Sequence, residues 1–154
     1  GFNYRMTDIQ AAVGREQLKR LPGILAARRR RAEIYASALS RVDGLTAPVE
    51  PSWAMSNWQS YCVGLAPHIN QRDVMQTMLD HGIATRRGIM CAHMEAPYRD
   101  APLSQPLHRS EAARDHSIIL PLYPQMSNEE QLRVIETLVA AVERSDRSLL
   151  RAAS

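Results

Sequence analysis

The spacing of the apolar residues changes once within residues 60–82, and this change limits the folds that the chain can adopt. In the first part every second residue is apolar, at Tyr61, Val63 and Leu65. After Pro67 the apolar residues follow helical spacing, at Val74, Met75, Met78 and Leu79. The sequence therefore predicts a strand over 60–66 and then a helix that Asn70 caps and Gly82 ends, so the fold must combine both element types.

Further helices are predicted at both ends of the chain. Two pairs of residues have the spacing of a capping box, Thr7 with Gln10 and Ser127 with Glu130. The first helix should break or kink at Pro22-Gly23, and a second helix is expected over 25–39. Residues 42–57 are rich in Pro, Gly and Ser, so we expect a surface connection there.

Two more strands complete the predicted fold. They are expected at 83–85 and at 118–122, the second at a sheet edge because Pro121 cannot donate to a ladder. Between them, 86–109 has no sustained period and is expected to be a binding loop. The expected fold class is α/β: long N-terminal helices followed by a small three-stranded sheet covered on one side by helices.

Basic residues are frequent, yet Lys19 is the only lysine beside eighteen arginines. The formal charge of +3 permits phosphate binding without demanding nucleic acid. Cys62 and Cys91 have no C-x-x-C spacing, so reduced thiols are expected, with one disulfide as the alternative. No apolar run approaches the roughly 18 residues of a membrane span, and a cytoplasmic location is expected.

The run Arg28-Arg29-Arg30-Arg31 could suggest a nucleic-acid binder. Consecutive helical positions lie about 100° apart, so the four side chains cannot form one basic stripe. A solvated face with some interface contact is expected instead. No metal site is expected, because four of the histidines lack the mutual spacing of metal ligands. They are His68, His81, His108 and His116.

Several blocks, in order along the chain, resemble the nucleotide-sugar aminotransferases of the DegT, DnrJ and StrS type. They are Gly1-Phe2-Asn3-Tyr4-Arg5 and the residues to Ala12, Gly82-Ile83-Ala84-Thr85-Arg86-Arg87, His93 with Tyr98, and Leu120-Pro121-Leu122-Tyr123-Pro124. This resemblance implies the C-terminal part of a fold type I, aspartate-aminotransferase-like enzyme. Residues 1–41 would be interface helices leading from a large domain that is missing here, and 42–154 the small α/β domain.

The resemblance also implies a cofactor, pyridoxal phosphate (PLP), in the whole enzyme. In enzymes of this family, the asparagine that matches Asn3 reaches across the dimer interface to the cofactor phosphate of the other subunit. Arg5 could support the same anionic site. The alternatives are that Asn3 caps a turn and that Arg5 is solvated. PLP is held by a lysine, and Lys19 does not match the family's lysine, so no catalytic residue is assigned.

A second predicted site follows from the resemblance of the loop after Gly82. Arg86 and Arg87 would bind the diphosphate of a nucleotide sugar, because guanidinium groups match phosphate oxygens in a bidentate way. His93 and Tyr98 would hydrogen-bond the sugar or phosphate. The alternative is that both arginines are merely solvated.

The function implied is transfer of an amino group, typically from glutamate, to a keto-sugar nucleotide in amino-sugar biosynthesis, by a homodimer. Because the chain starts at Gly1 without an initiator methionine, we expect a truncated or processed fragment that is inactive alone. A non-catalytic interaction module that retains the small domain is the first alternative, and a basic nucleic-acid binder ranks last.

Overall fold

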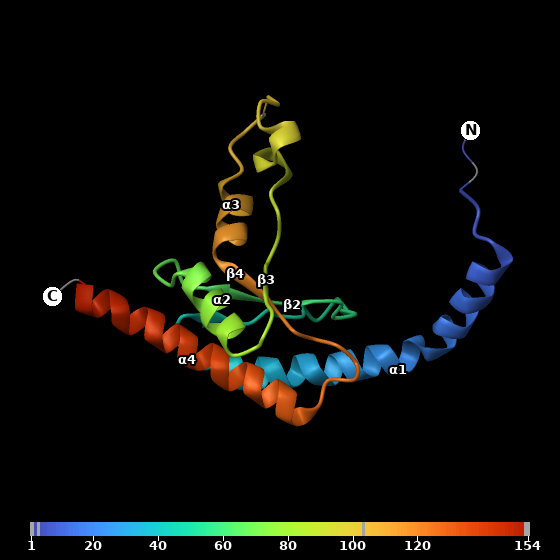
Figure 1. The fold of residues 1–154 in the computed structure, drawn as a ribbon, viewed down its shortest axis with the longest axis horizontal. Coiled ribbons are helices and arrows are strands. Elements are labelled where there is room, and N and C mark those ends of the chain that lie inside the picture. Colours follow the sequence, from blue (N-terminus) through green and yellow to red (C-terminus); the bar gives the residue numbers. More distant parts are fainter. Residues whose placement is uncertain (1, 3, 103, 153–154) are drawn as a thin grey trace.

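The computed structural model describes residues 2, 4–102 and 104–152, without the side chains of 147–152. Helices, strands and short 3-10 turns alternate along the chain (Figure 1). They are α1 (Asp8–Leu39), β1 (Leu45–Thr46), β2 (Tyr61–Leu65), α2 (Gln71–Asp80), β3 (Arg86–Arg87), η1 (Ala92–Met94), η2 (Ala96–Tyr98), α3 (His108–Asp115), β4 (Ser117–Leu120) and α4 (Asn128–Ala152).

The strands form one antiparallel sheet in the order β1-β2-β4-β3. The mixed helix and sheet class is confirmed, but the sheet has four strands where three were predicted. The extra strand, β1, lies in the stretch 42–57 that was predicted to be a connection. Two residues are too short to show a period of two, and β1 exists because Leu45 and Thr46 pair with the end of β2.

Two strand predictions need correction. The strand expected at 83–85 lies at 86–87, because the N–H of Ile83 closes the end of α2 by donating to the carbonyl of Met78. The strand expected at a sheet edge, β4, is internal and pairs with both β2 and β3. Pro121 is compatible with that place because β4 ends at Leu120, so the missing N–H falls outside the ladder.

One face of the sheet is covered by α1, α2 and α4, as predicted. Alternate residues of β2 and β4 point to this face, and the helices add the rest of the core. Among the largest fully buried side chains are Tyr35, Leu39, Tyr61, Val63, Val74, Met78, Ile118, Leu120, Met126 and Leu138. The rings of Tyr35 and Tyr61, with centroids 5.0 Å apart, join α1 to the sheet.

Local signals placed the helix starts correctly. Thr7 and Gln10 form the predicted capping box of α1. In α2, Asn70 accepts from the N–H groups of the first turn, and Gly82 follows the helix with a φ of +73°. At α4, the predicted pair of Ser127 and Glu130 exchanges two hydrogen bonds.

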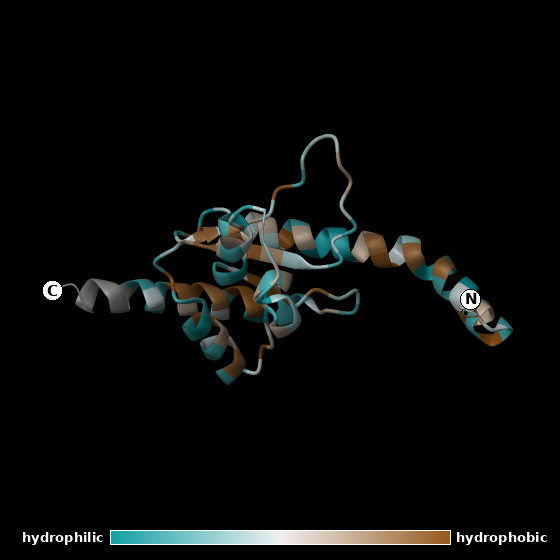
Figure 2. Ribbon diagram, turned by 90° about the horizontal axis from the view of Figure 1, so that it is seen from above, coloured by the Kyte–Doolittle hydropathy of each residue, from teal (hydrophilic) through white to brown (hydrophobic). Residues whose placement is uncertain are grey.

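Of the predicted break or kink at Pro22-Gly23, the break is wrong, and so is the separate helix over 25–39, because α1 is one helix with Pro22 inside it. Proline removes a single hydrogen bond, and the helix on either side retains its own. Figure 1 shows α1 changing direction in its N-terminal part, as a proline kink allows. Among the described residues, none before Ala32 is buried, and Figure 2 shows this part of α1 extending away from the body.

Candidate functional site

The predicted substrate residues lie on one continuous arm of the chain. The arm leaves the sheet at β3, passes through η1 and η2, and returns through α3 to β4 (Figure 1). It rises on the side of the sheet opposite α1 and α4. Arg86 and Arg87 lie on β3, His93 on η1 and Tyr98 on η2.

The two arginines of β3 lie on opposite faces of the sheet. Arg87 pairs with Ile118, which is fully buried under the helices, whereas Arg86 pairs with Ile119 on the other face. The arm leaves on this second face, because Gly88 lies directly against the side chains of Ser117 and Cys62. Arg86 therefore shares a face with the arm, and Arg87 does not.

Arg87 instead borders a groove of about 410 Å³ between α2 and β3. Its lining comes from both elements and the turn between them, at Arg72, Met75, Gln76, Leu79, Ala84, Thr85 and Arg87. Arg86 is exposed on the same strand, and β3 is at the edge of the sheet. The edge thus carries one guanidinium on each face.

His93 is held by a residue that the sequence did not single out. Its Nε2 lies 3.0 Å from Oε1 of Glu111 on α3, and Nδ1 of His108 lies 3.7 Å from the other carboxylate oxygen. The hydrogen bond to His93 lowers the pKa of the Glu111 carboxyl, against a smaller opposing effect of desolvation. No local pattern could identify Glu111, because it is separated from His93 by the whole tip of the arm.

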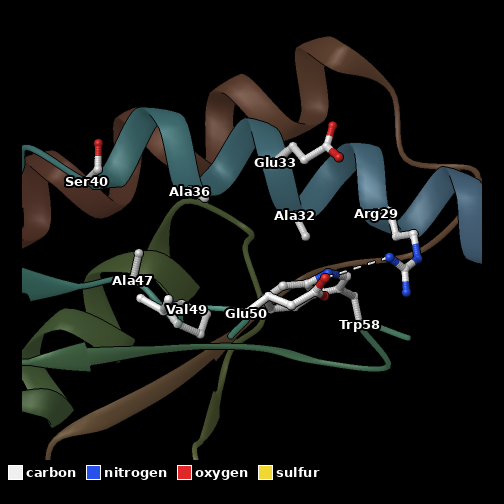
Figure 3. A pocket seen from close by; sticks show the side chains of 10 residues that line it. Arg29, Ala32, Glu33, Ala36, Ser40, Ala47, Val49, Glu50 and Trp58 are labelled. Atoms are coloured by element: carbon white, nitrogen blue, oxygen red, sulfur yellow. Dashed lines mark ion pairs between the residues drawn. The ribbon is translucent and has the colours of Figure 1, made fainter. Parts of the chain in front are cut away.

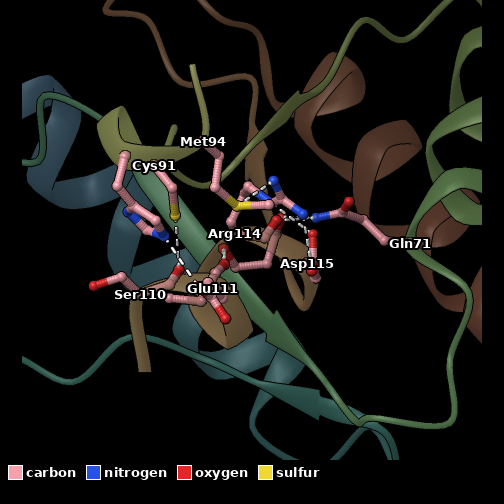
Figure 4. Close-up of polar contacts among 10 residues, drawn as sticks. Gln71, Cys91, Met94, Ser110, Glu111, Arg114 and Asp115 are labelled. Carbon is pink, nitrogen blue, oxygen red and sulfur yellow. Dashed lines mark hydrogen bonds and ion pairs between the residues drawn. The ribbon is translucent and has the colours of Figure 1, made fainter. Parts of the chain in front are cut away.

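Two further contacts fasten η1 to α3 (Figure 4). The Cys91 thiol donates to the carbonyl of Ser110 at 3.3 Å, and the Arg114 guanidinium donates to the sulfur of Met94. Arg114 also pairs with Asp115 at 2.8 Å, which lowers the pKa of that carboxyl. The arm therefore has a base in which Cys91, just before η1, and His93 and Met94 of η1 each contact α3.

Tyr98 lies beyond this base and is 58% exposed, so its hydroxyl can reach a ligand. The structure thus places His93 and Tyr98 on the same arm, but the two side chains differ in exposure and in contacts. His93 is fixed by a neighbour, with only 12% of its side chain exposed, while Tyr98 is open to solvent.

The predicted cofactor residues lie at the start of the chain. Asn3 is outside the described residues, and Arg5 is exposed before α1. Lys19 is exposed on α1, with its Nζ 2.5 Å from a carboxylate oxygen of Glu16. A lysine that carries PLP needs an activated amine beside the cofactor, and an exposed, ion-paired Lys19 does not fit that requirement. The residues of this chain therefore do not supply the attachment of PLP.

The arginine run of α1 is engaged within the chain more than predicted. Arg29 donates to the carbonyl of Ser56 and lies 3.9 Å from Glu50, whereas Arg31 binds residues on and before α4. Arg30 is exposed. The expected solvated face is therefore only partly right, and the guanidinium groups point toward different elements, as the helical spacing predicted.

A groove of about 370 Å³ lies where α1 meets the segment after β1 (Figure 3). Trp58 forms part of its wall, stacks on Tyr61 at 5.5 Å and has a φ of +46°, which is unusual for a bulky residue. Arg29 and Glu50 meet at one end of the groove. None of the predicted site residues that the structure describes lines this groove.

The described residues form neither a metal site nor a membrane-spanning helix. Within residues 2, 4–102 and 104–152, no three His, Cys, Asp or Glu side chains gather closely enough to hold a metal ion. In the same part of the chain, no helix has the length and apolar character needed to cross a membrane. Cys62 and Cys91 are both free thiols.

Comparison with known proteins gives a consistent family. The model of the DegT/DnrJ/EryC1/StrS aminotransferase family matches residues 1–139. A dTDP-4-dehydro-2,3,6-trideoxy-D-glucose 4-aminotransferase from Saccharopolyspora spinosa is 36% identical over 148 residues, which is 94% of this chain and 37% of that enzyme.

Solved structures of aminotransferases share the fold over nearly the same part of this chain as the relative above. The aminotransferase TlmJ from Streptoalloteichus hindustanus is 28% identical, with a TM-score of 0.81, over 89% of this chain and 36% of its own. DesV from S. venezuelae, solved with a ketimine intermediate, is 26% identical, with a TM-score of 0.84, over 93% of this chain and 38% of its own. The chain spans less than two fifths of each of these three relatives.

Proposed function

Because the chain belongs to the DegT/DnrJ/EryC1/StrS aminotransferase family, we propose that it is the C-terminal, substrate-side part of a PLP-dependent sugar aminotransferase. The whole enzyme would move an amino group, typically from glutamate, onto a keto-sugar nucleotide in cytoplasmic amino-sugar biosynthesis. The observation that carries this proposal is the 36% identity, across 94% of the chain, to an enzyme named as a sugar 4-aminotransferase.

The edge of the sheet at β3 is the proposed diphosphate site. Arg86 approaches this edge from the arm side and Arg87 from the α2 side, so an anion at the edge can meet both guanidinium groups. Tyr98 is open to solvent farther along the arm, where it can hydrogen-bond a sugar. His93 would contact the substrate from the base of the arm.

The N-terminal half of α1 is the proposed interface. The exposed apolar side chains of Leu18 and Leu21 on this half, together with Met6 just before the helix, border a groove of about 530 Å³. An apolar surface of this kind is typical of a protein contact. We therefore propose residues 1–41 as the interface part, which would contact the large domain and a second subunit, and 42–154 as the small domain. Asn3 and Arg5 would then approach the cofactor phosphate of the other subunit.

Catalysis would need a lysine from outside this chain, since Lys19 is exposed and paired with Glu16. The test compares two purified proteins, the chain alone and the chain joined to the lysine-bearing large domain that the proposal requires upstream of it. Given PLP, glutamate and a keto-sugar nucleotide, only the joined protein should show cofactor absorbance and transfer an amino group.

In the joined protein, Arg86→Gln should raise the KM for the nucleotide sugar, whereas Arg144→Gln, at an exposed position of α4 outside the proposed site and interface, should not. Transfer by the chain alone would contradict the proposal. A gene that encodes no lysine-bearing domain upstream would favour an interaction module instead. Tight DNA binding that weakens steeply with salt would favour the nucleic-acid alternative.

A further inference from the structure

The carboxylate of Glu111 lies against one of the two nitrogens of the His93 ring. Nε2 lies 3.0 Å from Oε1 of Glu111. An ionised carboxylate can only accept, and the lowered pKa of Glu111 keeps it ionised near neutral pH. Nε2 is therefore the donor, and Nδ1 is the nitrogen of the ring that Glu111 leaves available.

Contacts on either side of His93 hold η1 against α3, and so keep His93 beside Glu111. One residue before η1, Cys91 donates to the carbonyl of Ser110 at 3.3 Å, and Met94 at the end of η1 accepts from Arg114. These contacts flank His93 on both sides, and only 12% of the His93 side chain is exposed. The segment that carries His93 is therefore held on α3 on either side of the ring.

The second oxygen of Glu111 lies near another histidine. Nδ1 of His108, one helical turn earlier on α3, lies 3.7 Å from it. The other charged groups near this base include Arg114 and Asp115, which pair with each other at 2.8 Å, with Arg87 and His116 close enough to act on Asp115. Arg114 and Glu111 also attract each other through their charges. The carboxylate is therefore bracketed by His93 and His108.

We propose that Glu111 is a positioning residue, which holds His93 with Nε2 protonated and presents Nδ1 as a hydrogen-bond acceptor to a hydroxyl of the sugar substrate. This inference rests on the proposed function, because it assumes that His93 faces the substrate. A carboxylate behind an imidazole commonly sets its tautomer and orientation in this way. Glu111 itself would touch no reacting atom.

The tautomer can be measured in the chain labelled with ¹⁵N-histidine. Long-range ¹H–¹⁵N spectra at neutral to mildly alkaline pH should show His93 with Nε2 protonated. Glu111→Gln keeps the size of the side chain, but its amide can donate as well as accept, so the tautomer preference should weaken by roughly threefold to tenfold, as expected for one net hydrogen bond. The exposed Glu95→Gln makes the same change of charge and should leave the spectrum of His93 unaltered. An unchanged tautomer ratio in Glu111→Gln would overturn the inference.

A kinetic comparison in the chain joined to its large domain separates this inference from the function on which it rests. His93→Gln and Glu111→Gln should both raise the KM for the nucleotide sugar, with the smaller effect in Glu111→Gln. If His93→Gln raises KM and Glu111→Gln does not, the inference fails while the proposed role of His93 stands. If neither variant changes KM, the substrate role of His93 fails and takes the inference with it.

Discussion

Gln131 on α4 and Arg31 on α1 are joined by two hydrogen bonds that run in opposite directions. The Gln131 amide donates to the carbonyl of Arg31 at 2.7 Å, and the Arg31 guanidinium donates to the Gln131 side-chain oxygen at 3.2 Å. The same guanidinium also reaches Asn128 at 2.6 Å. Gln131 is 1% exposed, so this pair fastens the helix that carries the proposed interface to the last helix of the small domain.

Gln131→Ala should therefore destabilise the chain. The substitution removes both bonds and leaves a carbonyl of α1 and a guanidinium with fewer partners, at a cost of about 1–3 kcal/mol in the free energy of unfolding. Urea denaturation followed by circular dichroism measures the change. Gln76→Ala serves as the control, because Gln76 makes an exposed bond to Asp80 on its own helix. An equal loss in both variants would contradict this account.

The two stacked tyrosines of the core should respond differently to loss of the hydroxyl. The Tyr35 hydroxyl donates to the carbonyl of Pro121 at 2.8 Å, whereas the buried Tyr61 hydroxyl has no partner among the described residues. Tyr35→Phe should cost about 1 kcal/mol, while Tyr61→Phe should be neutral or stabilising, since it removes an unpaired buried polar group. Urea unfolding of both variants provides the comparison, and a larger loss in Tyr61→Phe would refute it.

Burial also makes the stability depend on pH through Tyr61. Burial raises the pKa of Tyr61 to about 12, above its ordinary value near 10. A raised pKa means that the stabilisation is complete below about pH 10 and is lost as pH rises through the pKa of the folded state. The melting temperature should thus fall between pH 10 and pH 12, and less steeply in Tyr61→Phe. Equal slopes in both proteins would show that Tyr61 is not responsible.

Gly88 and Gly23 should give opposite results when replaced by alanine. A Cβ on Gly88 would lie 1.8 Å from Oγ of Ser117 and 2.8 Å from Sγ of Cys62, so the base of the arm would have to shift. Gly88→Ala should cost on the order of 1–3 kcal/mol. Gly23 lies within α1 with nothing within 4 Å, and Gly23→Ala should stabilise the chain by about 0.5–1 kcal/mol.

Thermal melts decide between these outcomes for the two glycines. The double variant Gly88→Ala with Ser117→Ala should recover part of the loss, because it removes the oxygen that the new Cβ meets first. No recovery would indicate that the strain at Gly88 lies elsewhere.

The pKa of Glu111 should also control the attachment of the arm. Its hydrogen bond to His93 lowers this pKa, so the contribution of the contact is present above the ordinary glutamate pKa and is lost as pH falls through the pKa of the folded state. Hydrogen exchange of the amides of η1 should therefore become less protected under acid conditions. In Glu111→Gln this pH dependence should be largely absent, and an identical profile would argue against the contact.

Local interactions made several elements predictable. The capping boxes at Thr7 and Ser127, the cap at Asn70 and the alternation through Tyr61 depend on neighbours within a few residues, and all four predictions are confirmed. The two-residue strands β1 and β3 carry too little pattern to be located from sequence. The edge position predicted from Pro121 was wrong for a related reason. A proline costs a ladder hydrogen bond only if the strand includes it, and β4 ends at Leu120.

The sequence by itself determined the helix caps, the strand and helix at 61–80, and the ordered family blocks, because each rests on residue types close together in the chain. Only the tertiary structure decided the strand order, the opposite faces of Arg86 and Arg87, and the contact of His93 with Glu111. These depend on which strand pairs with which and on how the arm folds back. Such long-range pairing is set by the packing of the whole domain, and no short stretch of sequence contains it.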